Sequence, residues 1–302
     1  MTEEEVWKNF CDRNGVTSDT PHMTWKFGET PDYLVALVME KIKTATASAY
    51  ELYAIDEPEG MPKVGDYSVI LNARDEALCV IQTTKLTVIP YDEVGEEQAY
   101  KEGEGDRSLA YWRKIHWNFF INEYKEYGLT FKEKSKILCE EFELLYSIFS
   151  VEELTEKKAK EICTWRYEGE YAVYNFPKWE ECVRLGFDIA DQEKRKKEYF
   201  AVDKEGEFFG FFRVTKKEDF IELGVGIKPE LCGNHNGYNM MHLVVAKARQ
   251  MYPESPIQLI VRSFNKRAIK CYENLGFRVV KKYQESAHMI PGEMYLMILD
   301  KE

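Results

Sequence analysis

The sequence lacks the features that mark membrane proteins, secreted proteins and zinc proteins. Its 302 residues contain no window near the ~18 uninterrupted apolar residues that a membrane-spanning helix needs. The first ten residues, MTEEEVWKNF, are acidic where an export signal would be basic and then apolar. The seven cysteines form no C-x-x-C pair, and the five histidines form no H-E-x-x-H motif. These absences predict a cytoplasmic protein with reduced thiols, no bound metal and no membrane partner.

The chain also lacks an excess of basic residues, and its charge is unevenly distributed. Residues 1–150 hold 16 basic and 28 acidic residues, whereas residues 151–302 hold 25 of each. An acidic half repels a nucleic-acid backbone at long range, which argues against non-specific DNA or RNA binding by that half. The length corresponds to two domains of ~150 residues, and no Gly/Ser-rich linker separates them. We therefore expect domains at 1–150 and 151–302, with the boundary near 148–156.

The first half combines short strands with helices. The runs VGDYSVILN and ALCVIQTTKLTVIPY are rich in β-branched residues and bounded by Gly or Pro, which favours strands. In residues 107–148 apolar side chains recur at helical spacing, so this stretch is predicted to be mostly helical. Gly128 would end one helix, and Thr130 would cap the next, with Glu133 completing a capping box.

The second half has the element order of an α+β domain. Helices are predicted near 155–163 and 177–187, followed by a hairpin in YFAVDKEGEFFGFFRV and a strand in FIELGVGIKP. A helix at 237–251, the strand IQLIVRS, the helix NKRAIKCYENLG and two strands near 278–284 and 293–299 complete it. This order predicts a mixed β-sheet flanked by helices on both faces.

The segment NKRAIKCYENLGF carries the most specific pattern. Asn265 and Tyr272 lie seven residues apart, about two helical turns, and therefore share one face of a helix. Gly276 suits a left-handed cap at the end of that helix. Upstream, the strand at 221–227 leads through Gly233 into a helix start, whose free N–H groups and positive dipole end favour a diphosphate.

These segments resemble the GNAT superfamily of acetyl-CoA-dependent N-acetyltransferases, over roughly residues 155–302. The resemblance implies that the pantetheine arm of acetyl-CoA pairs with the strand and that its diphosphate meets the following loop. The cofactor-binding residues that it implies are Val225, Gly226, Ile227, Gly233, Asn234, His235, Asn236, Gly237, Tyr238 and Asn265. The family's loop reads Gln/Arg-x-x-Gly-x-Gly/Ala, but here Cys232 replaces the basic or amide residue and His235 replaces the first glycine. The alternative is a decayed transferase that keeps the fold and has lost the cofactor.

Two residues are the candidates for catalysis. The resemblance implies that Tyr272 is the general acid that returns a proton to the departing thiolate, although it could instead only pack. Glu222 is the candidate base for the amine proton, directly or through water, or else an exposed strand carboxylate. The acceptor would be a small-molecule or peptide amine. The aromatic segment 165–179, with Glu168 and Glu170, would suit a cationic amine or would form a packed lid.

Four segments of the first half resemble the ASCH domain, a small β-barrel with helices that is related to PUA RNA-binding modules. They are the K-T-A-T element after a helix in 25–50, GMPKVGDYSVIL, CVIQTTKLTVIPYDEV and GEGDRSLAYWRKIHWNFF, and together they cover about residues 20–147. Some ASCH proteins hydrolyse acetylcytidine with a lysine, a threonine and a glutamate. Lys43 and Thr46 match the first two, but Gln82 stands in the place of the glutamate, and an amide is no general base. Glu104 and Asp106 are nearby acids that could substitute.

Three functions therefore remain open. The first is an acetyltransferase whose N-terminal module binds a nucleotide or RNA. The second is a non-catalytic nucleotide- or RNA-binding protein, and the third is an acetylcytidine amidohydrolase. The first is favoured because the C-terminal helix carries the only intact motif, whereas the acidic first half weakens the second and Gln82 weakens the third.

Overall fold

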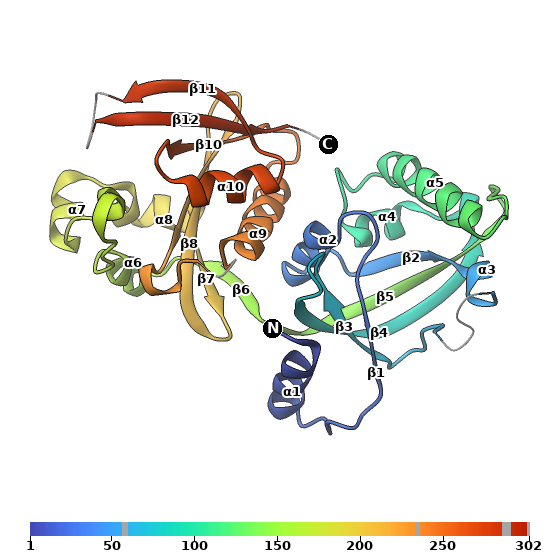
Figure 1. Cartoon of the computed structure of the whole chain (residues 1–302). Helices are drawn as coiled ribbons and strands as arrows, with labels where there is room; N and C mark the ends of the chain where they lie inside the picture. The colour runs from blue at the N-terminus through green and yellow to red at the C-terminus, as the bar shows by residue number, and fades with distance from the viewer. Residues whose placement is uncertain (56–59, 234–235, 286–290, 301–302) are drawn as a thin grey trace. The chain divides into compact units, whose positions relative to one another are not determined.

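A computed structural model describes residues 1–55, 60–233, 236–285 and 291–300 (Figure 1). The chain divides into two compact units, Met1–Ile148 and Phe149–Glu302, each with its own sheet. The α+β class expected from the sequence is confirmed. Among the helices in these ranges, none has the length and apolar character needed to cross a membrane.

The N-terminal unit is a five-stranded sheet with helices packed against it. The strands follow the order β1-β3-β4-β5-β2, with β1 parallel to β3 and the other neighbours antiparallel. Its elements are α1 (Glu3–Asn14), β1 (His22–Trp25), α2 (Pro31–Met39), β2 (Ala45–Ala49), α3 (Tyr50–Tyr53), β3 (Tyr67–Leu71), β4 (Ala77–Pro90), a 3-10 turn (Tyr91–Glu93), α4 (Glu96–Glu102), α5 (Leu109–Glu126) and β5 (Lys136–Ser147).

The predicted helix after Gly128 is wrong. Gly128 does end the α5 region in a left-handed conformation, but residues 136–147 form strand β5, which pairs with β4 along its length. Thr130 caps no helix; instead the Ser135 hydroxyl closes a turn by accepting from the backbone N–H of Lys132 at 3.1 Å. The helical spacing arose because β5 is buried at consecutive positions, Ile137 to Glu140, so strict alternation is absent. Long-range pairing therefore overrides the local pattern.

Helix α5 covers the sheet because one of its faces is aromatic. Trp112, Phe120 and Tyr124 are buried in one cluster with Ala47 of β2 and Ile137 of β5. The Ser108 hydroxyl caps the helix by accepting from the backbone N–H of Tyr111 at 3.1 Å. This packing fixes the start of α5 beside the end of β2.

Helix α4 lies along strand β2, at the end of the strand order. The backbone N–H of Thr44 donates to the carbonyl of Lys101 at 2.7 Å, and the Gln98 amide donates to the carbonyl of Thr46 at 3.1 Å. The helix thus supplies partners to backbone groups of an edge strand. It also brings the carboxyl end of α4 next to the loop between α2 and β2.

The C-terminal unit is a seven-stranded mixed sheet with helices on both faces. Its strand order is β11-β12-β10-β9-β8-β7-β6. The elements are β6 (Phe149–Glu153), α6 (Glu156–Ile162), α7 (Trp179–Leu185), α8 (Gln192–Glu198), β7 (Tyr199–Lys204), β8 (Glu207–Lys216), β9 (Ile221–Ile227), α9 (Asn236–Met251), β10 (Ile257–Arg262), α10 (Lys266–Asn274), β11 (Arg278–Glu285) and β12 (Gly292–Leu299), with 3-10 turns at Gly169–Tyr174, Asp188–Ala190 and Pro229–Leu231. Strand β6 and helix α8 were not predicted from the sequence; the other elements match.

In the middle of this sheet, the parallel strands β9 and β10 are paired at one end and separate at the other. Strands β9 and β10 pair only over Ile221–Leu223 and Ile257–Leu259, whereas β9 continues to pair with β8 as far as Ile227. Residues 224–227 therefore have no ladder partner on the β10 side within the described ranges. Figure 1 shows α9 and α10 next to these strands.

Candidate functional sites

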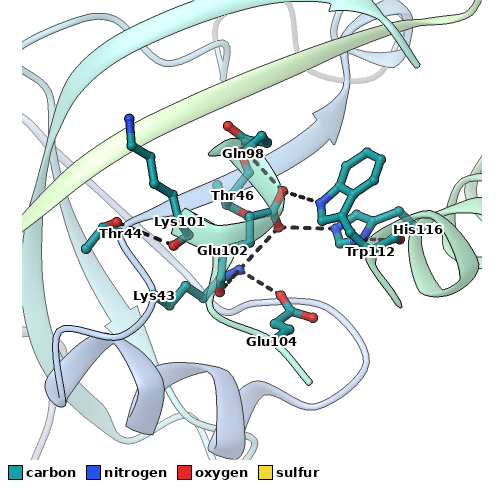
Figure 2. Close-up of polar contacts among 9 residues, drawn as sticks. All are labelled: Lys43, Thr44, Thr46, Gln98, Lys101, Glu102, Glu104, Trp112 and His116. Atoms are coloured by element: carbon teal, nitrogen blue, oxygen red, sulfur yellow. Dashed lines mark hydrogen bonds and ion pairs between the residues drawn. The ribbon is translucent and has the colours of Figure 1, made fainter. Parts of the chain in front are cut away.

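Lys43 is the centre of a buried polar cluster in the N-terminal unit (Figure 2). Its side chain is 1% exposed, and its ammonium lies 2.8 Å from a carboxylate oxygen of Glu104 and 3.4 Å from one of Glu102. Burial lowers the pKa of the Lys43 ammonium, but the charges of Glu104 and Glu102 outweigh burial and raise the pKa overall. Lys43 is therefore a cation at neutral pH and acts as a hydrogen-bond donor rather than as a base.

Two glycines bring both glutamates to Lys43. Gly103 and Gly105 have φ values of +76° and +54°, which disfavour other residues. A Cβ atom at Gly103 would lie 2.6 Å from the carbonyl oxygen of Ile42, and one at Gly105 would lie 2.5 Å from the ring of Tyr111. The loop after α4 can approach the loop before β2 because Gly103 has no side chain, and it can pass under the ring of Tyr111 because Gly105 has none.

The Glu102 carboxylate is fully occupied by donors. One oxygen accepts from Trp112 Nε1 at 2.6 Å and from Gln98 Nε2 at 3.0 Å. The other faces Lys43 and, at 3.2 Å, His116 Nε2. Burial raises the pKa of Glu102, but the charges of His116 and Lys43 and the donated hydrogen bonds lower it to about 2. Glu102 is thus a permanent anion with no lone pair left for a substrate proton.

His116 is a second buried partner of the Glu102 carboxylate. Its Nδ1 lies 3.1 Å from the carbonyl oxygen of Trp112, and its Nε2 faces Glu102, so both ring nitrogens meet acceptors. Burial lowers the pKa of His116, whereas the charge of Glu102 and its hydrogen bond raise it, and the net change is upward. The ring also stacks on Trp112 with a centroid distance of 4.2 Å.

Glu104 differs from Glu102 in having unused capacity. Its side chain is 16% exposed and accepts one hydrogen bond, from Lys43, within the described part of the chain. Glu102, Glu104 and His116 place one possible metal ligand each within 4.8 Å of one another. The Lys43 ammonium already forms an ion pair with each of the two carboxylates, so we interpret the group as an ion-pair cluster.

Of the other residues predicted for this site, Thr46 lies beside the cluster, whereas Gln82 and Asp106 have partners elsewhere. Thr46 lies two residues into β2 and contributes its carbonyl to Gln98. Gln82 lies on β4 and donates to the carbonyl of Gly65 at 3.0 Å, so the structure does not bring it to Lys43. Asp106 accepts from the backbone N–H of Ser108 at 2.8 Å. The sequence did not indicate that Glu102 and His116 belong to this cluster. Its one local signal for the site was the pair of glycines on either side of Glu104.

In the C-terminal unit, the predicted cofactor strand lies where β9 leaves β10. A Cβ atom at Gly226 would lie 2.4 Å from the ring of Phe211, so glycine is required for β8 and β9 to approach. The carbonyl of Ile227 accepts from the Tyr167 hydroxyl at 2.7 Å. Val225 lies between them and pairs with Phe212. The predicted strand residues therefore present backbone beside a tyrosine of the aromatic segment.

The predicted diphosphate loop is described in part. Gly233 has a φ of +98°, whereas Asn234 and His235 lie outside the described residues. Asn236 begins α9, and its side chain donates to the carbonyl of Leu231 at 3.0 Å.

The first turn of α9 continues the loop. A Cβ atom at Gly237 would meet Ile227 and Cys271 at 3.5 and 3.8 Å, which are ordinary contact distances. Tyr238 packs edge-on against His242, with ring centroids 4.8 Å apart. The start of α9 therefore lies against both β9 and α10.

Asn265 and Tyr272 occupy the two ends of α10. Asn265 is the N-cap: its side-chain oxygen accepts from the backbone N–H of Ala268 at 3.3 Å, and its amide donates to the Tyr174 hydroxyl at 3.1 Å. Tyr272 is half-buried beside Phe277, with ring centroids 6.0 Å apart. Burial raises the pKa of the Tyr272 hydroxyl, so it carries its proton at neutral pH.

Glu222 lies apart from these residues. It stands four residues before Gly226, roughly 13 Å along an extended strand, and Lys217 Nζ lies 3.8 Å from its carboxylate. The side chain is 37% exposed. Glu222 stays a predicted base, acting directly or through water.

An aromatic segment covers the same end of the sheet. The rings of Tyr171 and Tyr174 pack around Phe264, at centroid distances of 5.6 and 6.2 Å. Glu168 and Glu170 are exposed. The sequence shows that residues 165–179 are rich in aromatic side chains. It does not show that Tyr174 of this segment contacts Asn265, because the two residues are 91 positions apart.

Two family models match the chain, the ASCH domain over residues 23–146 and the acetyltransferase (GNAT) family over residues 145–277. No curated protein matches it. An ASCH domain from Lactobacillus crispatus is 28% identical, with a TM-score of 0.44, over 48% of this chain and 96% of its own. A protein from Enterococcus faecalis V583 is 34% identical, with a TM-score of 0.43, over 47% of this chain and 86% of its own. A GNAT-family acetyltransferase from Bacillus anthracis is 13% identical, with a TM-score of 0.42, over 51% and 95%. The two resemblances drawn from the sequence are confirmed.

Proposed function

We propose, for a chain that joins an ASCH domain to a GNAT-family N-acetyltransferase domain, that the C-terminal unit transfers the acetyl group of acetyl-CoA to an amine. The separation of β9 from β10 carries this proposal. Residues 224–227 keep their pairing with β8 and lack a ladder partner toward β10. The Ile227 carbonyl accepts from the Tyr167 hydroxyl, so the backbone of Val225 is what this strand offers to the amides of a pantetheine arm.

The start of α9 supports the same placement. Its 16 residues begin at Asn236, and Gly237 lies against the side chain of Ile227 at the end of β9. The N–H groups and the positive dipole end that the N-terminus of a helix presents suit the diphosphate of the cofactor. The backbone of β9 and the start of α9 are therefore adjacent, as the pantetheine arm and the diphosphate are adjacent in acetyl-CoA.

Acetyl-CoA supplies the acetyl group as a thioester. Tyr272 holds a proton at neutral pH and donates it to the sulfur as the carbon–sulfur bond breaks and the amide bond forms. Glu222 takes the proton that the amine loses, through water. The aromatic segment around Tyr171 and Tyr174 borders the acceptor, which we propose to be a small-molecule or peptide amine.

Calorimetry of acetyl-CoA with the full chain tests the cofactor assignment. Two matched glycine variants of β9 test the strand: Gly226→Ala meets the Phe211 ring, whereas a Cβ at Gly224 lies 3.8 Å from its nearest neighbour. Gly226→Ala is expected to weaken binding about tenfold or more, and Gly224→Ala to leave it unchanged. No binding by the unchanged chain contradicts the function, and equal binding by both variants contradicts the role of the strand. Thiol release with amines, polyamines, peptides and nucleosides then identifies the acceptor class.

For the N-terminal unit we propose a nucleotide- or RNA-binding site beside Lys43 that also hydrolyses an N-acylated nucleoside. The observation in favour is Glu104, a carboxylate with unused lone pairs in contact with Lys43, which fills the role left open by Gln82. Glu104 would accept a proton from the water that attacks the acyl carbon and would pass it to the departing amine, while Lys43 would hold the Glu104 carboxylate in place through their ion pair.

Acetylcytidine is the probe for this second function. Glu104→Gln is expected to abolish its hydrolysis while binding persists. Glu97→Gln is the matched control, because Glu97 is an exposed acid of α4 paired with Lys101. Hydrolysis that survives in Glu104→Gln would remove Glu104 from the mechanism. Binding without hydrolysis by the unchanged chain would leave a binding site alone.

A further inference from the structure

Arg267 is an exposed cation held against an aromatic ring. Its guanidinium carbon lies 4.3 Å from the centroid of Tyr171. In the part of the chain that the structure describes, no carboxylate forms an ion pair with it. A guanidinium stacked on a ring loses less freedom on binding and keeps its N–H groups directed outward.

The face of α10 that carries Arg267 also contacts the start of α9. Cys271 lies one turn after Arg267, on the same face of the helix, and its sulfur lies 3.8 Å from the Cβ position of Gly237. Arg267 is one turn closer to the N-terminus of α10. The ring on which it stacks, Tyr171, belongs to the same aromatic segment as Tyr167, whose hydroxyl donates to the carbonyl of Ile227. The cation is therefore held between α10 and the aromatic segment, close to the end of β9 and the start of α9.

The loop before α9 lacks the side chain that would ordinarily serve a diphosphate there. Cys232 stands where the resemblance expects arginine or glutamine, and its thiol points back to the carbonyl of Ile227 at 3.5 Å. Burial raises the pKa of this thiol, while the nearby charge of Arg267 acts in the opposite direction, which is consistent with the two side chains being close. The neighbouring acid Glu230 is paired with Lys228 at 3.4 Å.

We propose that Arg267 binds the diphosphate of acetyl-CoA in place of the side chain missing at position 232, and that Tyr171 positions it. This inference rests on the proposed acetyl-CoA function. A guanidinium suits a diphosphate because its planar N–H groups can donate two parallel hydrogen bonds to phosphate oxygens. The loss of a basic residue from the loop is then compensated from a different helix.

Calorimetry on the full chain with two probes tests the assignment. Coenzyme A contains the diphosphate, and pantetheine lacks it. Arg267→Gln is expected to weaken coenzyme A binding about tenfold or more and to leave pantetheine binding unchanged, because the lost interaction is a charged hydrogen bond. Lys270→Gln is the matched control, since it removes the same charge from an exposed position of the same helix and is expected to change neither affinity.

Restoring the family residue provides an independent test. In the Arg267→Gln background, Cys232→Arg is expected to recover most of the affinity for coenzyme A. Tyr171→Phe keeps the ring and is expected to bind normally, whereas Tyr171→Leu is expected to bind several-fold more weakly. Thermal unfolding of each variant confirms that the fold is intact.

The outcomes separate this inference from the function beneath it. If the unchanged chain binds coenzyme A and Arg267→Gln binds it equally well, Arg267 is not a ligand and the transferase assignment stands. If Arg267→Gln weakens coenzyme A and pantetheine alike, the residue shapes the site without binding the diphosphate. If the unchanged chain binds neither probe, the proposed function fails, and this inference fails with it.

Discussion

The two candidate sites differ in what their polar groups already bind. In the N-terminal cluster, Lys43, Glu102 and His116 satisfy one another, and only Glu104 has capacity left. In the C-terminal unit, by contrast, residues 224–227 and the start of α9 present backbone groups without a ladder partner among the described residues. The first arrangement stabilises the fold and leaves one group for chemistry, whereas the second offers strand backbone to the cofactor that we propose. Stability measurements should therefore be most sensitive at the first site and ligand measurements at the second.

The largest effect is expected from removing the cation of the N-terminal cluster. Lys43→Met leaves Glu102 and Glu104 without their shared partner in a buried site, and should lower the free energy of unfolding by about 3–5 kcal/mol. Lys26→Met is the control, because it breaks an exposed ion pair with Asp75 and should cost less than about 1 kcal/mol. Denaturant unfolding measures both. Equal losses in the two variants would show that the cluster is not closed to water.

At the C-terminal site the strongest effect should fall on turnover. Tyr272→Phe removes the hydroxyl but keeps the ring beside Phe277, so cofactor affinity and stability should be retained. Turnover should fall about ten- to a thousand-fold, because one positioned acid is lost. Steady-state kinetics with an identified acceptor, beside calorimetry of acetyl-CoA, measure the two quantities. Unchanged turnover would assign Tyr272 to packing alone.

The pH dependence of stability distinguishes the charged cluster from the rest of its unit. Because the pKa of His116 is raised in the folded state, its stabilising contribution is complete below pH 6.5 and disappears as the pH rises through the raised pKa. The difference in unfolding free energy between the unchanged chain and His116→Gln should therefore shrink as the pH rises above 6.5.

Other groups do not account for that difference. Glu102, with a pKa of about 2, stays ionised throughout this range. The pKa of Glu123 is raised to about 7 by burial and by the charge of Glu126, and is lowered in part by the charge of His116, so both chains are compared in a Glu123→Gln background. Chemical unfolding at pH 5 to 9 measures the comparison, and a difference that grows with pH would mean that His116 is neutral in the fold.

A smaller effect is expected at Glu222. Glu222 is exposed and is proposed to act through water, so Glu222→Gln should reduce turnover by about two- to tenfold. The reduction should be greatest at low pH, where few acceptor amines have already lost their proton. Kinetics from pH 6 to 9 test this, and a loss as large as that of Tyr272→Phe would place the carboxylate in direct contact with the amine.

The smallest effect is expected from separating the units. Residues 1–148 and 149–302 have their own sheets and cores, so each fragment should unfold with nearly the midpoint it has in the full chain. Thermal unfolding of the two fragments provides the measurement. A fragment that is insoluble or lacks a cooperative transition contradicts independent folding.

The sequence was most informative where chemistry follows local spacing. The strand–loop–helix around Gly233 and the helix from Asn265 to Tyr272 were both placed correctly, because their patterns span few residues. Strand β5 was predicted as a helix, because its conformation is determined by pairing with β4, a long-range contact that no local pattern in the sequence reports. The ion pair between Lys43 and Glu104 joins residues 61 positions apart, and no periodicity connects them. Arg267 was likewise invisible until its stacking on Tyr171 was known.

The tight loop after α4 also limits the order in which this protein can change over generations. A side chain at Gly105 would have a strained positive φ and would require the ring of Tyr111 to move or to become smaller. Gly103 is blocked by the backbone at Ile42, which no substitution removes. A lineage can therefore lose Gly105 by a permissive first step elsewhere, but Gly103 offers no such route. The positions of Glu102, Glu104 and Lys43 thus depend on Gly103 and Gly105, two residues without a side chain.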